Sequence, residues 1–170
     1  MEKLDRKLVQ LLAADGRMSY TDLGKATGLS TSAVHQRVRR LEERGVVQGY
    51  QAIIDPAQVG LPLTAYISLS PLDPAAPDDI PERVKGLPEI ESCHSVAGDF
   101  NYITKVRVAT PLDLEDLLTR LRGAAHVQTR TTVVLSTAWE GRPVTGKEAR
   151  SPRSPQVLGQ QLGQRRSVGS

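Results

Sequence analysis

The sequence predicts an α+β fold in two domains, and two observations carry that prediction. Over residues 1–45 apolar side chains recur at the spacing of α-helices, whereas from residue 61 onward they alternate with polar side chains, as in half-buried strands. The chain has 170 residues, 39% of them hydrophobic, which is enough for two small cores. We therefore expect a helical domain followed by a domain that contains both strands and helices.

Two helices are expected at the start of the chain. Leucines mark one face of the first: Leu4, Leu8, Leu11 and Leu12. This helix ends at residues 15–17. Ser19 is placed to cap the second helix, with Asp22 reaching back to the Ser19 N–H, and Gly28 supplies the left-handed backbone that ends it. Gly24, inside the second helix, is expected to lower helix stability by about 1 kcal/mol relative to alanine, which would leave this domain slightly less stable.

A third, basic helix is predicted over residues 31–44, capped by Ser30 and stopped by Gly45. Its buried apolar stripe is expected to be Val34, Val38 and Leu41. The opposite face offers hydroxyl, amide, imidazole and guanidinium groups, which read base edges and bind phosphates. Two helices joined by a tight turn, the second short and basic, are the layout of a helix-turn-helix, so double-stranded DNA is the expected partner. The residues expected to contact DNA are Ser30, Thr31, Ser32, His35, Gln36, Arg37, Arg39 and Arg40.

The expected DNA contacts divide by position along this helix. Ser32, His35 and Gln36 lie near its start, the part of a recognition helix that enters the major groove, so we expect them at base edges. Arg39 and Arg40 are expected to contact phosphates. Arg37 is nearer to the buried stripe, and pairing within the domain is an open alternative to DNA contact. For the whole helix, the alternative is a surface helix whose arginines pair with its own glutamates.

An extended segment is expected after the third helix, over residues 46–54. It is interpreted either as a small wing or as the strand that leaves the first domain. With this segment, the expected DNA-binding domain covers residues 1–54. Residues 55–61, which begin with Asp55-Pro56, are expected to form a hinge.

The elements that follow predict a ferredoxin-like domain over residues 62–140. In chain order, the expected strands and helices cover residues 63–69, 78–86, 90–96, 102–108, 112–121 and 127–139. Their order is βαββαβ, that of a four-stranded antiparallel sheet covered on one face by two helices. The uncovered face must pack on something, and a second copy of the chain is the simplest candidate.

The net charge of +3 is distributed unevenly. Residues 1–50 hold 9 Lys and Arg against 6 Asp and Glu, residues 56–140 hold 7 against 11, and residues 141–170 hold 6 against 1. Because phosphate contacts need positive charge, the acidic middle segment is not expected to bind nucleic acid. Residues 141–170 have almost no large apolar side chains and are expected to form a disordered basic tail, with solubility favoured over DNA binding as its role.

Other classes of protein find little support in the sequence. No run approaches about 20 apolar residues and the charged start lacks the apolar run of a signal peptide, so we expect a cytoplasmic protein without a membrane span. The single cysteine, Cys93, is interpreted as a small core residue. His94 and His126 have no second ligand at metal-binding spacing, so neither a metal, a cofactor nor a catalytic residue is expected.

Two sets of motifs stand out, one in each half of the chain. In the first half they are residues 4–6, 15–17, 29–30, 37–42 and 45–47. In the second half they are Gly98-Asp99-Phe100-Asn101-Tyr102 and Thr129-Arg130-Thr131. Together, over roughly residues 3–140, they resemble one family, the Lrp/AsnC (leucine-responsive, or feast/famine) transcriptional regulators of bacteria and archaea.

This resemblance implies an N-terminal winged helix-turn-helix joined by a hinge strand to a C-terminal domain that senses amino acids. It also implies a homodimer that commonly assembles into tetramers or octamers, acting at the nucleoid, with the effector bound between subunits. The effector-binding residues that the resemblance implies are Gly98, Asp99, Phe100, Asn101, Tyr102, Thr129 and Thr131. Such a set suits an amino acid, because glycine admits a close backbone approach and polar side chains can hold the ammonium and carboxylate.

Departures from the family pattern leave alternatives open. Asn101 replaces the usual aspartate, which removes one negative charge from the implied site, and residues 125–127 (Ala-His-Val) replace the usual Pro-Gly-Val. Asp99 can equally cap its loop, and Tyr102 can equally be a sheet aromatic. An architectural DNA-binding protein without an effector is therefore an alternative function. An enzyme resembling the sirohaem decarboxylases is disfavoured, because the second domain is acidic and holds only two histidines.

Overall fold

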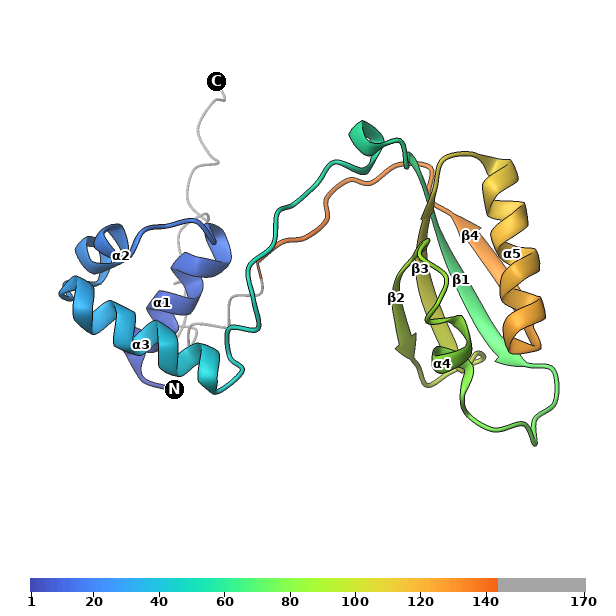
Figure 1. Ribbon diagram of the computed structural model, residues 1–170, viewed down its shortest axis with the longest axis horizontal. Coiled ribbons are helices and arrows are strands. Elements are labelled where there is room, and N and C mark those ends of the chain that lie inside the picture. Colours follow the sequence, from blue (N-terminus) through green and yellow to red (C-terminus); the bar gives the residue numbers. More distant parts are fainter. Residues whose placement is uncertain (144–170) are drawn as a thin grey trace, which may run out of the picture. The chain divides into compact units, whose positions relative to one another are not determined.

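The structure is a computed structural model that describes residues 1–143, and it divides into two compact units, Met1–Gly49 and Tyr50–Arg142 (Figure 1). Each unit has a hydrophobic core of its own. The basic tail expected over residues 141–170 lies, from residue 144 onward, outside the described residues.

The first unit is a three-helix domain. It consists of α1 (Lys3–Ala14), α2 (Tyr20–Thr27) and α3 (Thr31–Glu43). The side chains buried in its core are Leu8, Leu12, Leu23, Val34, Val38 and Leu41. The apolar stripe predicted for the third helix is therefore confirmed.

Side chains cap both helices of the helix-turn-helix as expected. The Ser19 hydroxyl accepts the Asp22 N–H at 3.1 Å, and the Ser30 hydroxyl accepts the Ala33 N–H at 3.2 Å. Gly28 ends α2 in the left-handed conformation, with φ of 74°. The hydrogen bond that the Asp22 carboxylate accepts has a different donor from the one expected. The donor is the Ser19 hydroxyl, at 2.7 Å, whereas the sequence predicted the Ser19 backbone N–H.

Gly24 has a role that the sequence did not predict. It is buried in α2, and a Cβ added to it would lie 2.7 Å from the backbone oxygen of Leu29. The turn between α2 and α3 thus approaches the helix so closely that only glycine fits without movement. The expectation that glycine weakens this helix relative to alanine was wrong, because it considered helix propensity and not this contact.

We predict that Gly24→Ala lowers the free energy of unfolding by about 1–3 kcal/mol, because the new methyl group forces the Leu29 backbone away. Chemical denaturation of the full chain, followed by circular dichroism, measures the change. Gly123→Ala is the matched control, because an added Cβ there meets nothing within 4 Å. That control is expected to gain about 1 kcal/mol from helix propensity. Equal stabilisation of both variants would contradict the steric argument.

Residues 46–54 form neither helix nor strand. Neither of the expected alternatives, a small wing or a strand that leaves the first domain, is therefore present in this segment. The backbone N–H groups of Val46 and Val47 both donate to the Leu41 oxygen, which closes the end of α3. Within the expected hinge, Pro56–Val59 form a short 3-10 helix, η1, whose first turn is capped by the Asp55 carboxylate.

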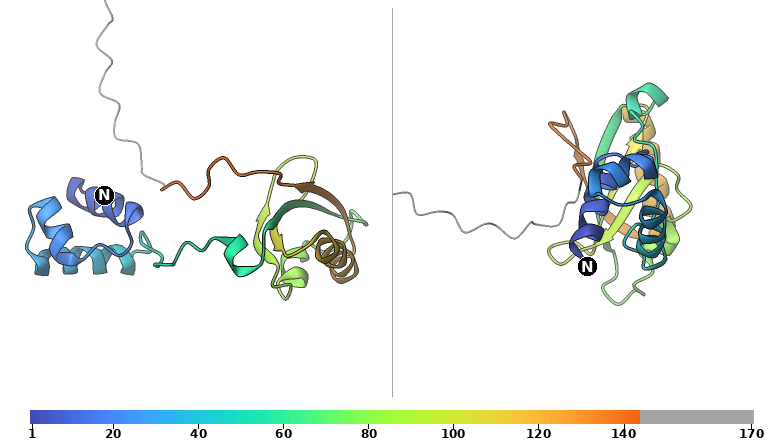
Figure 2. Two further views of the ribbon diagram at one scale, coloured as in Figure 1. Left: turned by 90° about the horizontal axis from the view of Figure 1, so that it is seen from above. Right: turned by 90° about the vertical axis from the view of Figure 1, so that its left-hand side faces the viewer.

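The second unit has the predicted βαββαβ order. Its elements are β1 (Leu63–Pro71), α4 (Ile80–Val84), β2 (Ile90–Ser95), β3 (Tyr102–Val108), α5 (Pro111–Ala125) and β4 (Val127–Val133). The strands are antiparallel in the order β2-β3-β1-β4, and both helices lie on the same side of the sheet (Figure 2). Alternate side chains of β1, including Ala65, Ile67 and Leu69, point into the core beneath the helices.

Strand β4 is shorter than predicted. It ends at Val133, which pairs with Ala65, and the Val134 N–H makes one more bond to the Thr64 oxygen. Because β1 begins at Leu63, later residues have no strand to pair with. The alternation of apolar residues to residue 139 therefore overestimated its length.

Helix α5 is fixed at both ends. Thr110 and Asp113 form a complete capping box, and His126 follows the helix in the left-handed conformation with φ of 52°. A side chain in that conformation costs roughly 1–2 kcal/mol, which is why glycine is favoured there. His126, which stands where the family pattern has glycine, thus occupies a strained backbone position.

Candidate DNA-binding and effector sites

The outward face of α3 is exposed along its whole length. Ser32, His35, Gln36, Arg39 and Arg40 are all exposed, as are Ser30 and Thr31 at the start of the helix. The opposite stripe is at most 1% exposed. The core thus fixes which face of α3 meets solvent, and seven of the eight predicted DNA contacts lie on accessible positions.

Arg37 is the exception. Its Nη1 donates to the Glu2 and Asp5 carboxylates of the N-terminal segment and α1, at 2.7 Å each. These hydrogen bonds, first with Glu2 and then with Asp5, raise the pKa of Arg37 above its ordinary value. The geometry favours the intradomain alternative, in which Arg37 anchors α3 to α1.

Arg39 and Arg40 differ in their surroundings. The Arg39 Nε donates to the Glu43 carboxylate at 2.8 Å, and both side chains are well exposed. Arg40 has no side-chain partner within residues 1–143. Arg40 is therefore available to a phosphate, whereas Arg39 shares its charge with Glu43.

We predict that Glu43→Gln raises affinity for DNA roughly fivefold, because it removes a negative charge beside the phosphates and releases Arg39. The gain should shrink at high salt. Fluorescence anisotropy with a labelled duplex at two salt concentrations measures both effects. Glu115→Gln on α5 is the control for the change in net charge. A rise shared equally by both variants would contradict the role of the Arg39–Glu43 pair.

The loop between β2 and β3 holds most of the implied effector residues. Gly98, Asp99 and Asn101 are exposed, and Phe100 is half-buried. The Asn101 N–H donates to the Leu69 oxygen at 3.0 Å, which holds the loop beside β1. These residues are thus accessible on a supported loop.

Tyr102 points elsewhere. Its ring is buried in the core under the helices, and its hydroxyl donates to the Asp78 carboxylate at 2.6 Å. That hydrogen bond, with burial, raises the pKa of Tyr102 to about 12. The structure therefore favours the alternative that Tyr102 is a sheet aromatic.

Thr129 and Thr131 are not beside the loop in a single chain. They lie on β4, opposite Leu69 and Ile67 of β1, so β1 separates them from β3. The Thr129 hydroxyl accepts from Arg122 Nε at 2.9 Å. One chain therefore does not gather all seven implied residues into one pocket.

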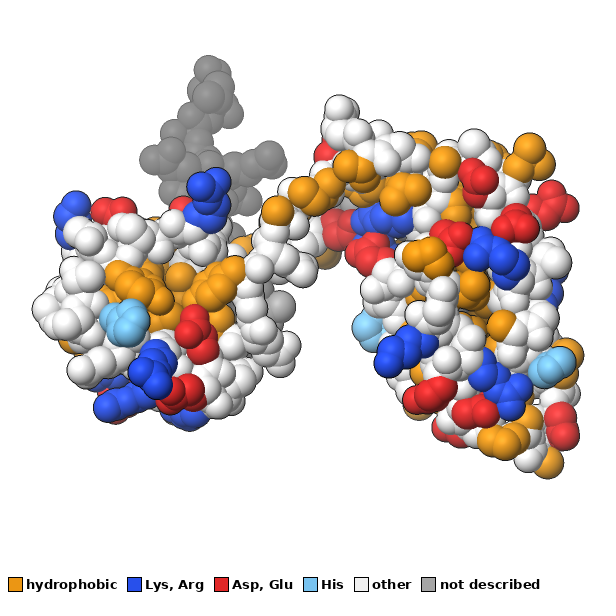
Figure 3. All heavy atoms as spheres, in the orientation of Figure 1, with side chains coloured by type: hydrophobic (Ala, Val, Ile, Leu, Met, Phe, Trp, Pro, Cys, Tyr) orange, Lys and Arg blue, Asp and Glu red, His pale blue; other side chains and the backbone are white. Residues whose placement is uncertain are grey.

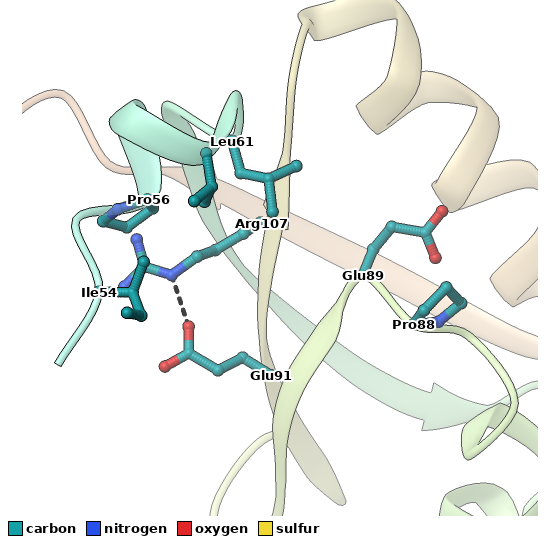
Figure 4. A pocket seen from close by; sticks show the side chains of 8 residues that line it. Ile54, Pro56, Leu61, Pro88, Glu89, Glu91 and Arg107 are labelled. Carbon is teal, nitrogen blue, oxygen red and sulfur yellow. Dashed lines mark hydrogen bonds and ion pairs between the residues drawn. The ribbon is translucent and has the colours of Figure 1, made fainter. Parts of the chain in front are cut away.

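Sequence reasoning missed a cavity in the second unit. Its volume is about 510 Å³. Figure 4 shows the side chains that line it. Its lining consists of Ile54, Pro56, Val59, Leu61, Pro88, Glu89, Glu91 and Arg107. No pattern in the sequence distinguished these apolar residues near the expected hinge from ordinary linker residues.

A cluster of ion pairs lies next to this cavity, on the sheet face away from the helices. Arg107 pairs with Glu91 at 2.6 Å and with Glu140 at 3.1 Å, and Lys105 pairs with the same two carboxylates. The hydrogen bond from Lys105 to Glu140 holds the pKa of the Glu140 carboxyl below its ordinary value. All four charges are thus paired with one another.

No three His, Cys, Asp or Glu side chains of residues 1–143 come together as metal ligands. In the same part of the chain, no helix is both long enough and apolar enough to cross a bilayer.

A helix-turn-helix with an exposed basic helix, followed in one chain by an antiparallel α+β domain, defines a class: the two-domain transcriptional regulators. Residues 1–42 match the AsnC-type helix-turn-helix domain, and residues 64–144 match the Lrp/AsnC ligand binding domain. The chain belongs to the Lrp/AsnC family of transcriptional regulators, and is therefore not an enzyme.

Relatives of known name and structure agree with this assignment. The HTH-type transcriptional regulator LrpA of Mycobacterium tuberculosis is 52% identical over 142 residues, which cover 84% of this chain and 95% of LrpA. A structure of the M. tuberculosis feast or famine regulatory protein with L-methionine is 51% identical, has a TM-score of 0.83, and covers 85% of this chain and 99% of its own. A Neisseria meningitidis regulator with L-methionine is 26% identical, with a TM-score of 0.78 and coverage of 86% and 96%.

Proposed function

We propose that this regulator binds specific double-stranded DNA through α3 and that a small effector, an amino acid, biases its DNA affinity or assembly. The observation that carries the proposal is the orientation of α3. Its apolar stripe is buried and its hydroxyl, amide, imidazole and guanidinium groups face solvent. Ser32, His35 and Gln36 would meet base edges, and Arg39 and Arg40 would meet phosphates, with Ser30 and Thr31 at the start of the helix.

We further propose that the regulator is a cytoplasmic homodimer that assembles into tetramers or octamers. The second unit exposes large apolar side chains, notably Ile53, Leu135 and Trp139, at 93%, 96% and 65%. Exposed apolar surface of this kind is typical of surfaces that a partner covers. A dimer would present two α3 helices about one turn of DNA apart, to a pseudo-palindromic site.

We predict that replacing Arg39 and Arg40 together by alanine abolishes gel shifts on the protein's own promoter DNA, because two phosphate contacts are lost. The oligomeric state, measured by size-exclusion chromatography with light scattering, should not change. Arg83→Ala with Lys85→Ala, at the end of α4 and directly after it, is the control for an equal loss of charge, and should keep the shift. Retained binding in the Arg39 and Arg40 variant would overturn the role assigned to α3.

The proposed effector site combines the exposed loop of residues 98–101 with Thr129 and Thr131 across a subunit boundary. Relatives have been crystallised with L-methionine, which supports an amino acid as the class of ligand. Within one chain β1 lies between the loop and β4, and in the proposed site the loop of one copy meets β4 of another. Such a ligand changes DNA binding only if it prefers one subunit arrangement over another.

We predict that at least one L-amino acid raises the thermal midpoint, with a gain of about 2–3 kcal/mol at 100 times its dissociation constant. Differential scanning fluorimetry against the twenty amino acids measures the effect, with the D-enantiomer of each hit as control. Asn101→Asp should strengthen it, because a carboxylate attracts the ammonium group. If none of the twenty stabilises either protein, the effector-independent architectural function, which Asn101 leaves open, replaces this part of the proposal.

A further inference from the structure

A contact between two aromatic rings joins the two helices of the helix-turn-helix. The rings of Tyr20, the first residue of α2, and His35, in the second turn of α3, have centroids 5.4 Å apart and planes at 73°. This is the edge-to-face arrangement that aromatic rings prefer. His35 is the only histidine of residues 1–49. Figure 3 shows the side chains of the first unit coloured by type, with histidine in pale blue near hydrophobic, basic and acidic side chains.

The position of the Tyr20 ring in this contact is fixed by its surroundings. Tyr20 directly follows the Ser19 cap, and its half-buried ring packs against the core of the first unit. His35 is itself exposed. An exposed side chain ordinarily samples several rotamers, and a neighbouring ring that is fixed by the core reduces that freedom.

The position of His35 on α3 matches a base-reading role. It shares the outward face with Ser32 and Arg39, three residues before it and four after it. Imidazole nitrogens can donate to N7 of a purine or O6 of guanine in the major groove. A group that is held in its binding orientation loses less freedom on contact, so its contribution to sequence preference is larger.

We propose that Tyr20 is a positioning residue for sequence recognition: it orients His35, and His35 specifies one purine in each half-site of the DNA. This inference rests on the proposed DNA contact of α3. Tyr20 itself makes no base contact in this account. Its ring acts only through the imidazole, so its hydroxyl is dispensable and its aromatic ring is not.

The test is selection from a library of duplexes with a random core of about 20 base pairs, two turns of the double helix. The full-length protein is compared with His35→Ala, Tyr20→Leu and Tyr20→Phe. The unchanged protein should select a purine at one position of each half-site. His35→Ala should lose that preference by about tenfold, within the range for one base pair. Tyr20→Leu should lose much of the same preference, at the same position, and Tyr20→Phe should keep it.

Measured affinities for the selected duplex and for one substituted at that base pair complete the test. A purely structural Tyr20 would make Tyr20→Leu bind both duplexes more weakly by one common factor, and that result would overturn the proposal. So would an unchanged purine preference in His35→Ala. The two proposals fail differently: if the unchanged protein selects no sequence at all, the DNA-binding role of α3 fails first. Thermal melts of each variant identify any that do not fold; if Tyr20→Leu is one of them, Tyr20→Met, which also lacks an aromatic ring, takes its place with the same expected loss of purine preference.

Discussion

Burial of one apolar stripe of α3 is the constraint on which the rest of the first unit depends. Val34, Val38 and Leu41 are enclosed by leucines of the other two helices, so the helix cannot rotate without exposing them. The Ser30 cap fixes where α3 starts, and the Arg37 pairs with Glu2 and Asp5 join it to α1. The groups left on the opposite face are thereby held together as one surface.

The second unit obeys a similar constraint with a different result. Its helices cover one face of the sheet, and alternate side chains of each strand fill the core beneath them. The other face carries the paired charges of Lys105, Arg107, Glu91 and Glu140. Exposed apolar side chains of the flanking segments lie in the same unit. The face that the helices do not cover, with exposed apolar side chains in the same unit, suits contact with a second copy of the chain. The loop at residues 98–101 remains accessible for a ligand.

Periodicity and capping residues were sufficient to predict the helices, the βαββαβ order and the exposed face of α3, because those features depend on local sequence. The errors arose where residues that are distant in the sequence determine the local structure. The tight approach of Leu29 to Gly24, the end of β4 set by the start of β1, and the absence of a wing leave no local pattern. Arg37 illustrates the same limit, since its partners lie more than 30 residues away. A family resemblance implied Thr129 and Thr131, but only the strand order separates them from their loop.

Helix α3 is the element that we propose lies against DNA. A DNA-cleaving iron chelate can be attached to a cysteine at the end of α3, in Arg44→Cys with Cys93→Ser, and compared with the same group on Leu112→Cys of α5. Arg44 ends the helix outside the proposed contacts, and Leu112 is 75% exposed in the other unit. If α3 lies against DNA, bound promoter DNA is cleaved from residue 44, at two places about one helical turn apart, and not from residue 112. Cleavage from residue 112 alone would contradict it.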